Sequence, residues 1–200
     1  MIGILAVQGD FREHELMFQR LGIPSRRVRR GEDLAGLRGL VIPGGESTTI
    51  GKLAREYGVE EEARRLYRKG ALALWGTCAG AIWLSREVEG YPEQPRLGLL
   101  DLRVARNAYG RQVESFETDL AIEGFDAPFH AIFIRAPVIT RVGEGLRVLA
   151  VYRGDPVFVL GERAMVTTFH PELTEDPRVH RFFVERVVAD VRADVGPVAP

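Results

Sequence analysis

The sequence predicts an α/β fold: a central, mostly parallel sheet with helices on both faces and an antiparallel extension in its second half. Two observations predict it. In the first half, short apolar runs alternate with helix-like stretches, the pattern of βαβ units. In the second half, strand-like runs follow one another with turn signals between them. The 200 residues, 46% hydrophobic and 28% charged, fit one globular domain over residues 1–200.

The chain begins with a predicted buried strand and an amphipathic helix. Residues 2–7, IGILAV, are uninterruptedly apolar. Asp10 is expected to cap the helix that follows, with Glu13 completing a capping box. The expected apolar positions of this helix include Leu16, Phe18 and Leu21.

The rest of the first half repeats this alternation. Further strands are expected over residues 25–30, 37–42 and 71–75. A helical region should begin at Ser47 or Thr48 and run to about Arg68, with a break at Gly58. A short helix over 81–88, AIWLSREV, should follow the strand over 71–75.

The second half predicts a meander of mostly antiparallel strands and one final helix. The expected strands fall within residues 96–106, 111–122, 130–140, 147–152, 156–162 and 163–169. Residues 177–195 predict an amphipathic helix, because Val179, Phe182, Phe183 and Val187 recur at helical spacing.

Charge and cysteine content restrict the partners and the compartment. The chain has 27 basic and 28 acidic residues and a net charge of −1, so no strongly basic field argues for nucleic acid or a membrane surface. The single cysteine cannot form an intrachain disulfide, and the first apolar run ends at Val7, too short for a signal peptide. We therefore expect a cytoplasmic protein with no membrane span.

Cys78 stands in G-T-C-A-G, directly after a predicted strand and before a predicted helix. This is the glycine-flanked nucleophile elbow, with cysteine in the place of serine. The N-terminal N–H groups of the following helix favour a thiolate, and the backbone N–H of Ala79 can stabilise an oxyanion. Taken alone, a single cysteine is equally well explained as a small buried apolar residue.

Two further strand ends carry polar residues. His170 and Glu172 flank Pro171 after the last strand, so the glutamate can hold one imidazole nitrogen while the other faces a thiol. A turn with a solvated glutamate is the alternative. The P-G-G-E-S loop, residues 43–47, can aim an N–H at a reacting carbonyl, or it can be a plain loop capped by Ser47. Neither a Walker A pattern nor a GxGxxG follows the early strands.

The other histidines predict no metal site. His14, His130 and His180 are scattered, and one cysteine does not complete a zinc cluster with them. His14 can face a partner from the first helix, whereas His130 and His180 are expected at the surface.

Together and in this order, the glycine loop, the cysteine elbow and the late His-x-Glu resemble the class I, triad-type glutamine amidotransferases. A closer resemblance, over nearly the whole chain, is to the glutaminase subunits of pyridoxal 5′-phosphate synthase. The segments that carry it are AVQGDFREH (6–14), PGGEST (43–48), GTCAG (76–80), LGLLD (97–101), ARNAYGRQVESFE (105–117), FIRAP (133–137) and TFHPELTED (168–176).

The resemblance implies a flavodoxin-like, three-layer glutaminase domain and a role for each matching residue. Cys78 would be the nucleophile, His170 the acid and base, and Glu172 its orienting partner. The N–H groups of Gly45 and Ala79 would form the oxyanion hole. L-Glutamine would be bound by Gly45, Glu46, Ser47, Arg106, Ile134 and Arg135.

The same resemblance implies the partner and the chemistry. Glutamine would be hydrolysed to glutamate and ammonia, and the ammonia passed to a synthase subunit in a hetero-oligomer for vitamin B6 biosynthesis. No metal or organic cofactor is implied, since pyridoxal 5′-phosphate is the product of the whole complex. Two alternatives stay open: a glutaminase subunit of another amidotransferase, and a non-catalytic flavodoxin-like module with a redox cysteine.

Overall fold

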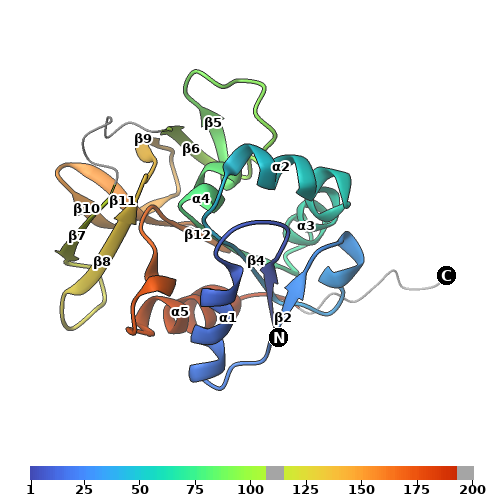
Figure 1. The fold of residues 1–200 in the computed structure, drawn as a ribbon, viewed down its shortest axis with the longest axis horizontal. Helices are drawn as coiled ribbons and strands as arrows, with labels where there is room; N and C mark the ends of the chain where they lie inside the picture. The colour runs from blue at the N-terminus through green and yellow to red at the C-terminus, as the bar shows by residue number, and fades with distance from the viewer. Residues whose placement is uncertain (107–114, 193–200) are drawn as a thin grey trace.

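The computed structural model describes residues 1–106 and 115–192, and its centre is a seven-stranded sheet (Figure 1). The strand order is β10-β11-β12-β4-β3-β1-β2. Their bounds are β1 Ile2–Leu5, β2 Ser25–Val28, β3 Gly39–Ile42, β4 Ala73–Thr77, β10 Arg147–Tyr152, β11 Asp155–Leu160 and β12 Ala164–Thr167. Five neighbouring strands pair in parallel, in the order β2, β1, β3, β4 and β12. Strands β11 and β10 then extend the sheet beyond β12 with antiparallel pairing. The predicted α/β fold is confirmed.

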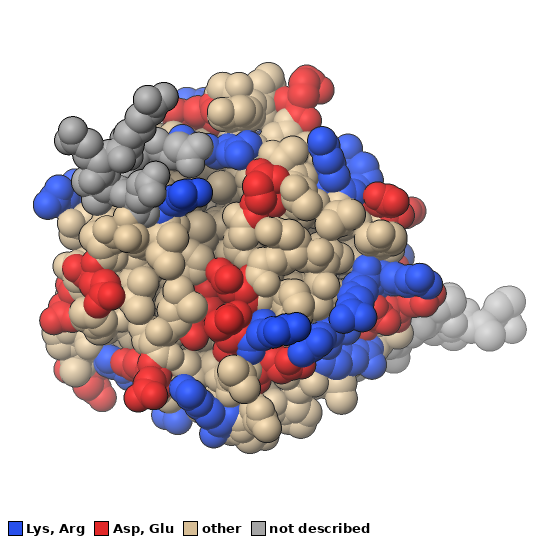
Figure 2. Space-filling model, in the orientation of Figure 1, with Lys and Arg blue, Asp and Glu red and all other residues tan. Residues whose placement is uncertain are grey.

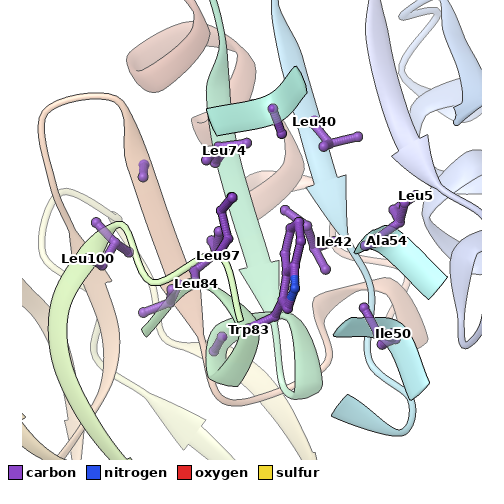
Figure 3. Close-up of a cluster of buried hydrophobic side chains, with 14 of the residues drawn as sticks. Leu5, Leu40, Ile42, Ile50, Ala54, Leu74, Trp83, Leu84, Leu97 and Leu100 are labelled. Carbon is purple, nitrogen blue, oxygen red and sulfur yellow. The ribbon is translucent and has the colours of Figure 1, made fainter. Parts of the chain in front are cut away.

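Helices cover both faces of this sheet. Their bounds are α1 Phe11–Arg20, α2 Ser47–Glu56, α3 Val59–Arg68, α4 Ala79–Leu84 and α5 Arg178–Phe182. Alternate strand residues point to opposite faces. Leu40, Ile42 and Leu74 point toward α2 and α4 (Figure 3). Val41 and Trp75 point the other way and pack in the cluster formed by α1 and α5.

The second half does not form one continuous meander. Strand β6, Leu100–Ala105, pairs in parallel with β5, Ser85–Val88, and antiparallel with β9, Val138–Val142. Strands β7, Ser115–Leu120, and β8, Phe129–Ile134, form a separate hairpin. The predicted antiparallel extension is therefore divided among three sheets.

Three local predictions were wrong, on the helix over 81–88, the Asp10 cap and Leu16, and one helix differs from the prediction in type. The helix expected over 81–88 ends at Leu84, because the Ser85 hydroxyl bonds to the Ala81 carbonyl oxygen at 2.7 Å and the chain then turns into β5. The final helix is present over residues 178–188, as predicted, but its second part, Phe183–Val188, is a π-helix. Asp10 makes no cap hydrogen bond, and Leu16 is 54% exposed.

The predicted helix break is confirmed, since Gly58 separates α2 from α3 with a φ of 74°. Segments 107–114, which hold much of the RNAYGRQ motif, and 193–200, which include the end of the predicted last helix, lie outside the described residues.

The surface drawn in Figure 2 carries basic and acidic side chains interspersed with one another, in line with the net charge of −1. Among the described residues, we find no helix with the length and apolar character that crossing a membrane requires.

Candidate active site

Cys78 lies between β4 and α4 in a strained conformation. Its φ of 48° and ψ of −105° fall where non-glycine residues are rarely found. The chain packs closely on both sides of it. A Cβ on Gly76 would collide with the backbone of Gly80, and one on Gly80 would collide with the carbonyl oxygen of Ile42. The predicted elbow is thus present, with the sulfur at the carboxyl end of the parallel strands.

His170 and Glu172 form a buried pair beside this elbow. Nδ1 of His170 lies 2.6 Å from Oε1 of Glu172, and both residues are at most 5% exposed. Burial acts to lower the pKa of His170, but interactions with Cys78 and with Glu172, including the negative charges of both, raise it to about 11. Burial acts to raise the pKa of Glu172, but His14 and the bond and charge of His170 hold it below its usual value.

The loop after β1 and the glycine loop after β3 meet next to His170. The backbone N–H of Asp10 donates to the carbonyl oxygen of Gly44 at 3.0 Å. Oε1 of Gln8 accepts from the N–H of Glu46 at 2.9 Å. Gly44 must be glycine, because a Cβ there would lie 2.5 Å from Cε1 of His170. These two loops and the elbow therefore converge at the carboxyl edge of the parallel strands.

Asp10 faces His170 instead of capping α1. Its Oδ2 lies 3.7 Å from Nδ1 of His170. Burial, followed by the charge of Glu172, raises the pKa of this carboxyl, and the charge of His170 opposes that rise. Asp10, His170 and Glu172 place possible metal ligand atoms within 4.8 Å of one another, but the 2.6 Å bond of the histidine to the glutamate already engages two of them.

Glu46, and not Ser47, caps α2. Its carboxylate accepts from the N–H groups of Thr48 at 3.1 Å and Thr49 at 2.7 Å. The Ser47 hydroxyl is buried and accepts from Nε2 of Gln94 at 2.8 Å. Sequence reasoning missed Gln94, because no pattern distinguishes a single glutamine in a loop.

Gln94 also holds Arg106. Its Oε1 accepts from Arg106 at 2.8 Å, and the same guanidinium reaches Thr48 Oγ1 at 3.2 Å and Glu46 Oε1 at 3.4 Å. The guanidinium carbon lies 4.6 Å from the ring centre of Tyr91. Arg106 is therefore fixed by several partners at the rim of the site.

These elements enclose a cavity of about 340 Å³, within the range of small-molecule sites. Its lining comprises Asp10, Gly45, Glu46, Ser47, Cys78, Ala79, Ile82, Arg106, Ile134, Arg135, Pro137 and His170. Every residue implied by the resemblance lines it except Glu172, which lies behind His170. Arg135 enters from the turn between β8 and β9, where its φ is 45°.

The remaining histidines correct two expectations. His14 does not face outward and His180 is not at the surface, since both are fully buried between α1, α5 and Trp75. The aromatic cluster there, with Phe18 beside His180, makes burial favourable for the rings. His130 is exposed, as expected, between Glu117 and Asp119.

Comparisons with known sequences agree with one another. The model of the SNO glutamine amidotransferase family matches residues 4–189. A Thermus thermophilus protein named pyridoxal 5′-phosphate synthase subunit PdxT is 63% identical over 185 residues, covering 92% of this chain and 96% of that protein. A Deinococcus radiodurans protein of the same name is 54% identical over 187 residues, with 92% and 95% covered.

Solved structures share the fold. One described as a glutamine amidotransferase superposes with a TM-score of 0.91 at 60% identity, covering 94% of this chain and 98% of that chain. A putative GMP synthase protein from Thermoplasma acidophilum superposes with a TM-score of 0.66 at 16% identity, with 94% and 93% covered, a likeness of fold alone.

Proposed function

The chain belongs to the SNO glutamine amidotransferase family, and we propose that it hydrolyses L-glutamine and delivers the ammonia to a pyridoxal 5′-phosphate synthase subunit. The observation that carries this proposal is that Cys78 and His170 both line the cavity, with Glu172 hydrogen-bonded to His170 behind it, in a relative of proteins named for that synthase. We also propose that residues 1–200 form one domain, which the family match over 4–189 supports.

The first chemical step is acylation. The Cys78 thiolate attacks the side-chain carbonyl carbon of glutamine, and the carbonyl oxygen becomes an oxyanion held by the N–H groups of Gly45 and Ala79. With its pKa raised to about 11, His170 already carries the proton that the leaving amino group needs. The carbon–nitrogen bond breaks, ammonia leaves, and a γ-glutamyl thioester remains on the sulfur.

The second step is hydrolysis of the thioester. Acylation removes the negative sulfur, one of the causes that raise the pKa of His170. The imidazole, now neutral, can accept a proton from water as the oxygen attacks the thioester carbon. Glutamate is released and the thiolate and imidazolium re-form. The same histidine is thus acid in one step and base in the next.

Substrate binding is proposed for the polar rim of the cavity. A guanidinium suits the α-carboxylate of glutamine, and carboxylate or carbonyl oxygens suit its α-ammonium. Arg106, Arg135 and Glu46 supply these groups, while Gly45, Ser47 and Ile134 line the intervening wall.

Replacing Arg135 by alanine should lower kcat/KM for glutamine by about 10- to 100-fold, the loss of one charge-assisted hydrogen bond. The measurement is steady-state glutamate release in the assembled complex. Arg153→Ala is the matched control, because Arg153 also has a positive φ, 50°, but does not line the cavity. Equal kinetics for both variants would remove Arg135 from the glutamine site, and a change only in the affinity for the synthase subunit would place it at the interface.

Activation by the partner is proposed to act through the Gly44–Gly45 peptide. A backbone hydrogen bond from the Asp10 N–H to the Gly44 oxygen holds this peptide. Turning it breaks that bond, at a cost of about 1 kcal/mol, and glycine tolerates the φ values of both orientations. The Gly45 N–H turns with it, into or out of the oxyanion hole. A synthase subunit that binds the competent orientation better shifts the population toward it.

Adding the synthase subunit of the same organism should therefore raise glutamate release by up to about 10²–10³-fold, the usual value of one oxyanion donor. The assay compares the purified chain with and without that subunit. The Cys78→Ala chain mixed with the subunit controls for contaminating glutaminase. Equal rates with and without the subunit would contradict the gating and the proposed partnership together.

A glutamine-analogue alkylator separates this function from a redox-cysteine module. Incubation should leave one adduct on Cys78, found by mass spectrometry of peptides, and free glutamine should protect against it. A redox module would show no such protection. The proposed chemistry needs a reduced thiol, which also supports the cytoplasm as the compartment.

A further inference from the structure

A chain of buried polar groups continues beyond the proposed triad. Glu172 uses Oε1 for His170, and its Oε2 is buried without a hydrogen bond in the described structure. An ionisable group of α1 faces that oxygen: Nε2 of His14 lies 3.6 Å from it, and both side chains are fully buried. A carboxylate oxygen that is removed from water destabilises the folded protein unless a hydrogen-bond donor faces it. Whether the facing atom of His14 carries a hydrogen therefore matters.

The tautomers of two histidines decide whether His14 presents a donor. Nδ1 of His14 lies 2.9 Å from Nε2 of His180, so one of these atoms carries the shared hydrogen. Nδ1 of His180 is buried with no partner in the described structure. A hydrogen there would be an orphaned donor among aromatic rings, so the hydrogen of His180 belongs on Nε2. His180 then donates to Nδ1 of His14, and the hydrogen of His14 must sit on Nε2.

Thr77 agrees with this assignment. Its hydroxyl donates to the carbonyl oxygen of Ile42 at 3.5 Å and so offers a lone pair to Nε2 of His14, 3.3 Å away. The hydrogen bonds among these buried groups then all run in one direction: His180 donates to His14, and the Nε2–H of His14 is directed toward Thr77 and Glu172.

We propose that His14 is a positioning residue for the hydrolysis: its Nε2–H, fixed by His180, faces the free oxygen of Glu172 and holds that carboxylate in line with His170. The inference rests on the proposed glutaminase function, and it gives a role in catalysis to His14 and His180, which do not line the cavity.

The electrostatics favour a neutral donor at this place. Burial lowers the pKa of His14 to about 3, although the Glu172 carboxylate opposes the shift, and burial lowers that of His180 to about 3 as well. A second imidazolium beside Glu172 would share its charge and weaken its hold on His170. A neutral N–H stabilises the carboxylate and leaves its full charge for the triad histidine.

The tautomers can be observed directly. The chain has 4 histidines, so selective ¹⁵N labelling gives a spectrum of four rings that single His→Gln variants assign. We expect neutral Nε2–H tautomers for His14 and His180 from about pH 5 to 9, a range across which an ordinary histidine titrates. A hydrogen on Nδ1 of His14 would overturn the proposal, and this test needs no enzymatic activity.

A matched pair of amides tests the role in catalysis. The amide nitrogen of glutamine can occupy the place of a histidine Nε2, whereas that of asparagine reaches only the place of Nδ1. His14→Asn should lower kcat by about 10- to 100-fold with little change in KM, the range seen when an orienting partner is lost. His14→Gln should recover most of this loss. Equal losses in both folded variants would overturn the proposal.

A double-mutant cycle separates positioning from packing. If His14 acts through the carboxylate, His14→Asn in a Glu172→Gln background should cost almost nothing more. Undiminished loss in that background would mean a structural role only and overturn the proposal. Thermal unfolding of each variant checks the fold.

The proposed glutaminase function is tested separately: the wild-type complex should release glutamate and the Cys78→Ala complex should not. Failure of the proposed function is thus distinguishable from failure of the His14 assignment.

Discussion

Cys78→Ala is expected to lower kcat for glutamine hydrolysis by about 10⁶-fold, the cost of losing the nucleophile of a triad. The alanine has no atom that can form the thioester, and the oxyanion donors alone cannot replace it. Glutamate release by the complex with the synthase subunit is the measurement. Activity within tenfold of the wild type would contradict the assignment of Cys78.

Cys78→Gly provides the structural control. The φ of 48° and ψ of −105° at this position are strained for cysteine and alanine but open to glycine. Glycine should therefore raise the free energy of unfolding by about 1 kcal/mol over alanine, strain relief of about 1–3 kcal/mol less the added backbone entropy. Both variants should be inactive. A gain in stability over the alanine variant would show that the backbone at this position is strained for a residue that carries a Cβ.

Local patterns were sufficient for the parallel half of the fold. Each apolar run from residue 2 to 77 contains a strand of the central sheet, and Gly58 breaks the helical region where expected. Strands β1, β3 and β4 are buried on both faces, so their sequences are mostly apolar and hard to mistake, whereas the edge strand β2 is polar and partly exposed.

Predictions failed where tertiary contacts outweigh local preference. Residues 85–88 have a helix-compatible sequence, yet pairing with β6 makes them a strand. Asp10 has the position and the side chain of a helix cap, but the chain holds it beside His170. The division of the second half into three sheets depends on long-range pairing, which strand patterns do not encode.

The candidate site was predicted better than its surroundings. Cys78, His170 and the glycine loop stand at strand ends that a parallel sheet necessarily brings together, so their motifs alone indicated the centre of the site. Arg106, Ile134 and Arg135 lie at the ends of strands of other sheets, and only the family resemblance pointed to them. The histidines behind the site were misjudged because buried and exposed histidines look alike in sequence. His14 and His180 are 166 positions apart, and only the packing of α1 against the C-terminal helix joins them.

His170→Asn should be about as damaging as loss of the cysteine, near 10⁶-fold in kcat, because triad members act as a unit. Asparagine supplies neither a proton donor for the leaving ammonia nor a base for the water. Single-turnover assays with excess enzyme would distinguish failed acylation from failed hydrolysis. We expect no thioester to accumulate, whereas trapped thioester at the wild-type rate would restrict His170 to the second step.

Glu172→Gln should cost less, about 10⁴-fold, and should change the pH dependence. Glu172 raises the pKa of His170 through a hydrogen bond and through its charge, against the effect of burial. The raised value of about 11 keeps the imidazolium protonated up to that pH, so removing the carboxylate lets it lose its proton at lower pH. The alkaline limb of kcat/KM should consequently move to lower pH in the variant. An unmoved limb, or a loss greater than that of His170→Asn, would show that Glu172 does not orient and charge this histidine.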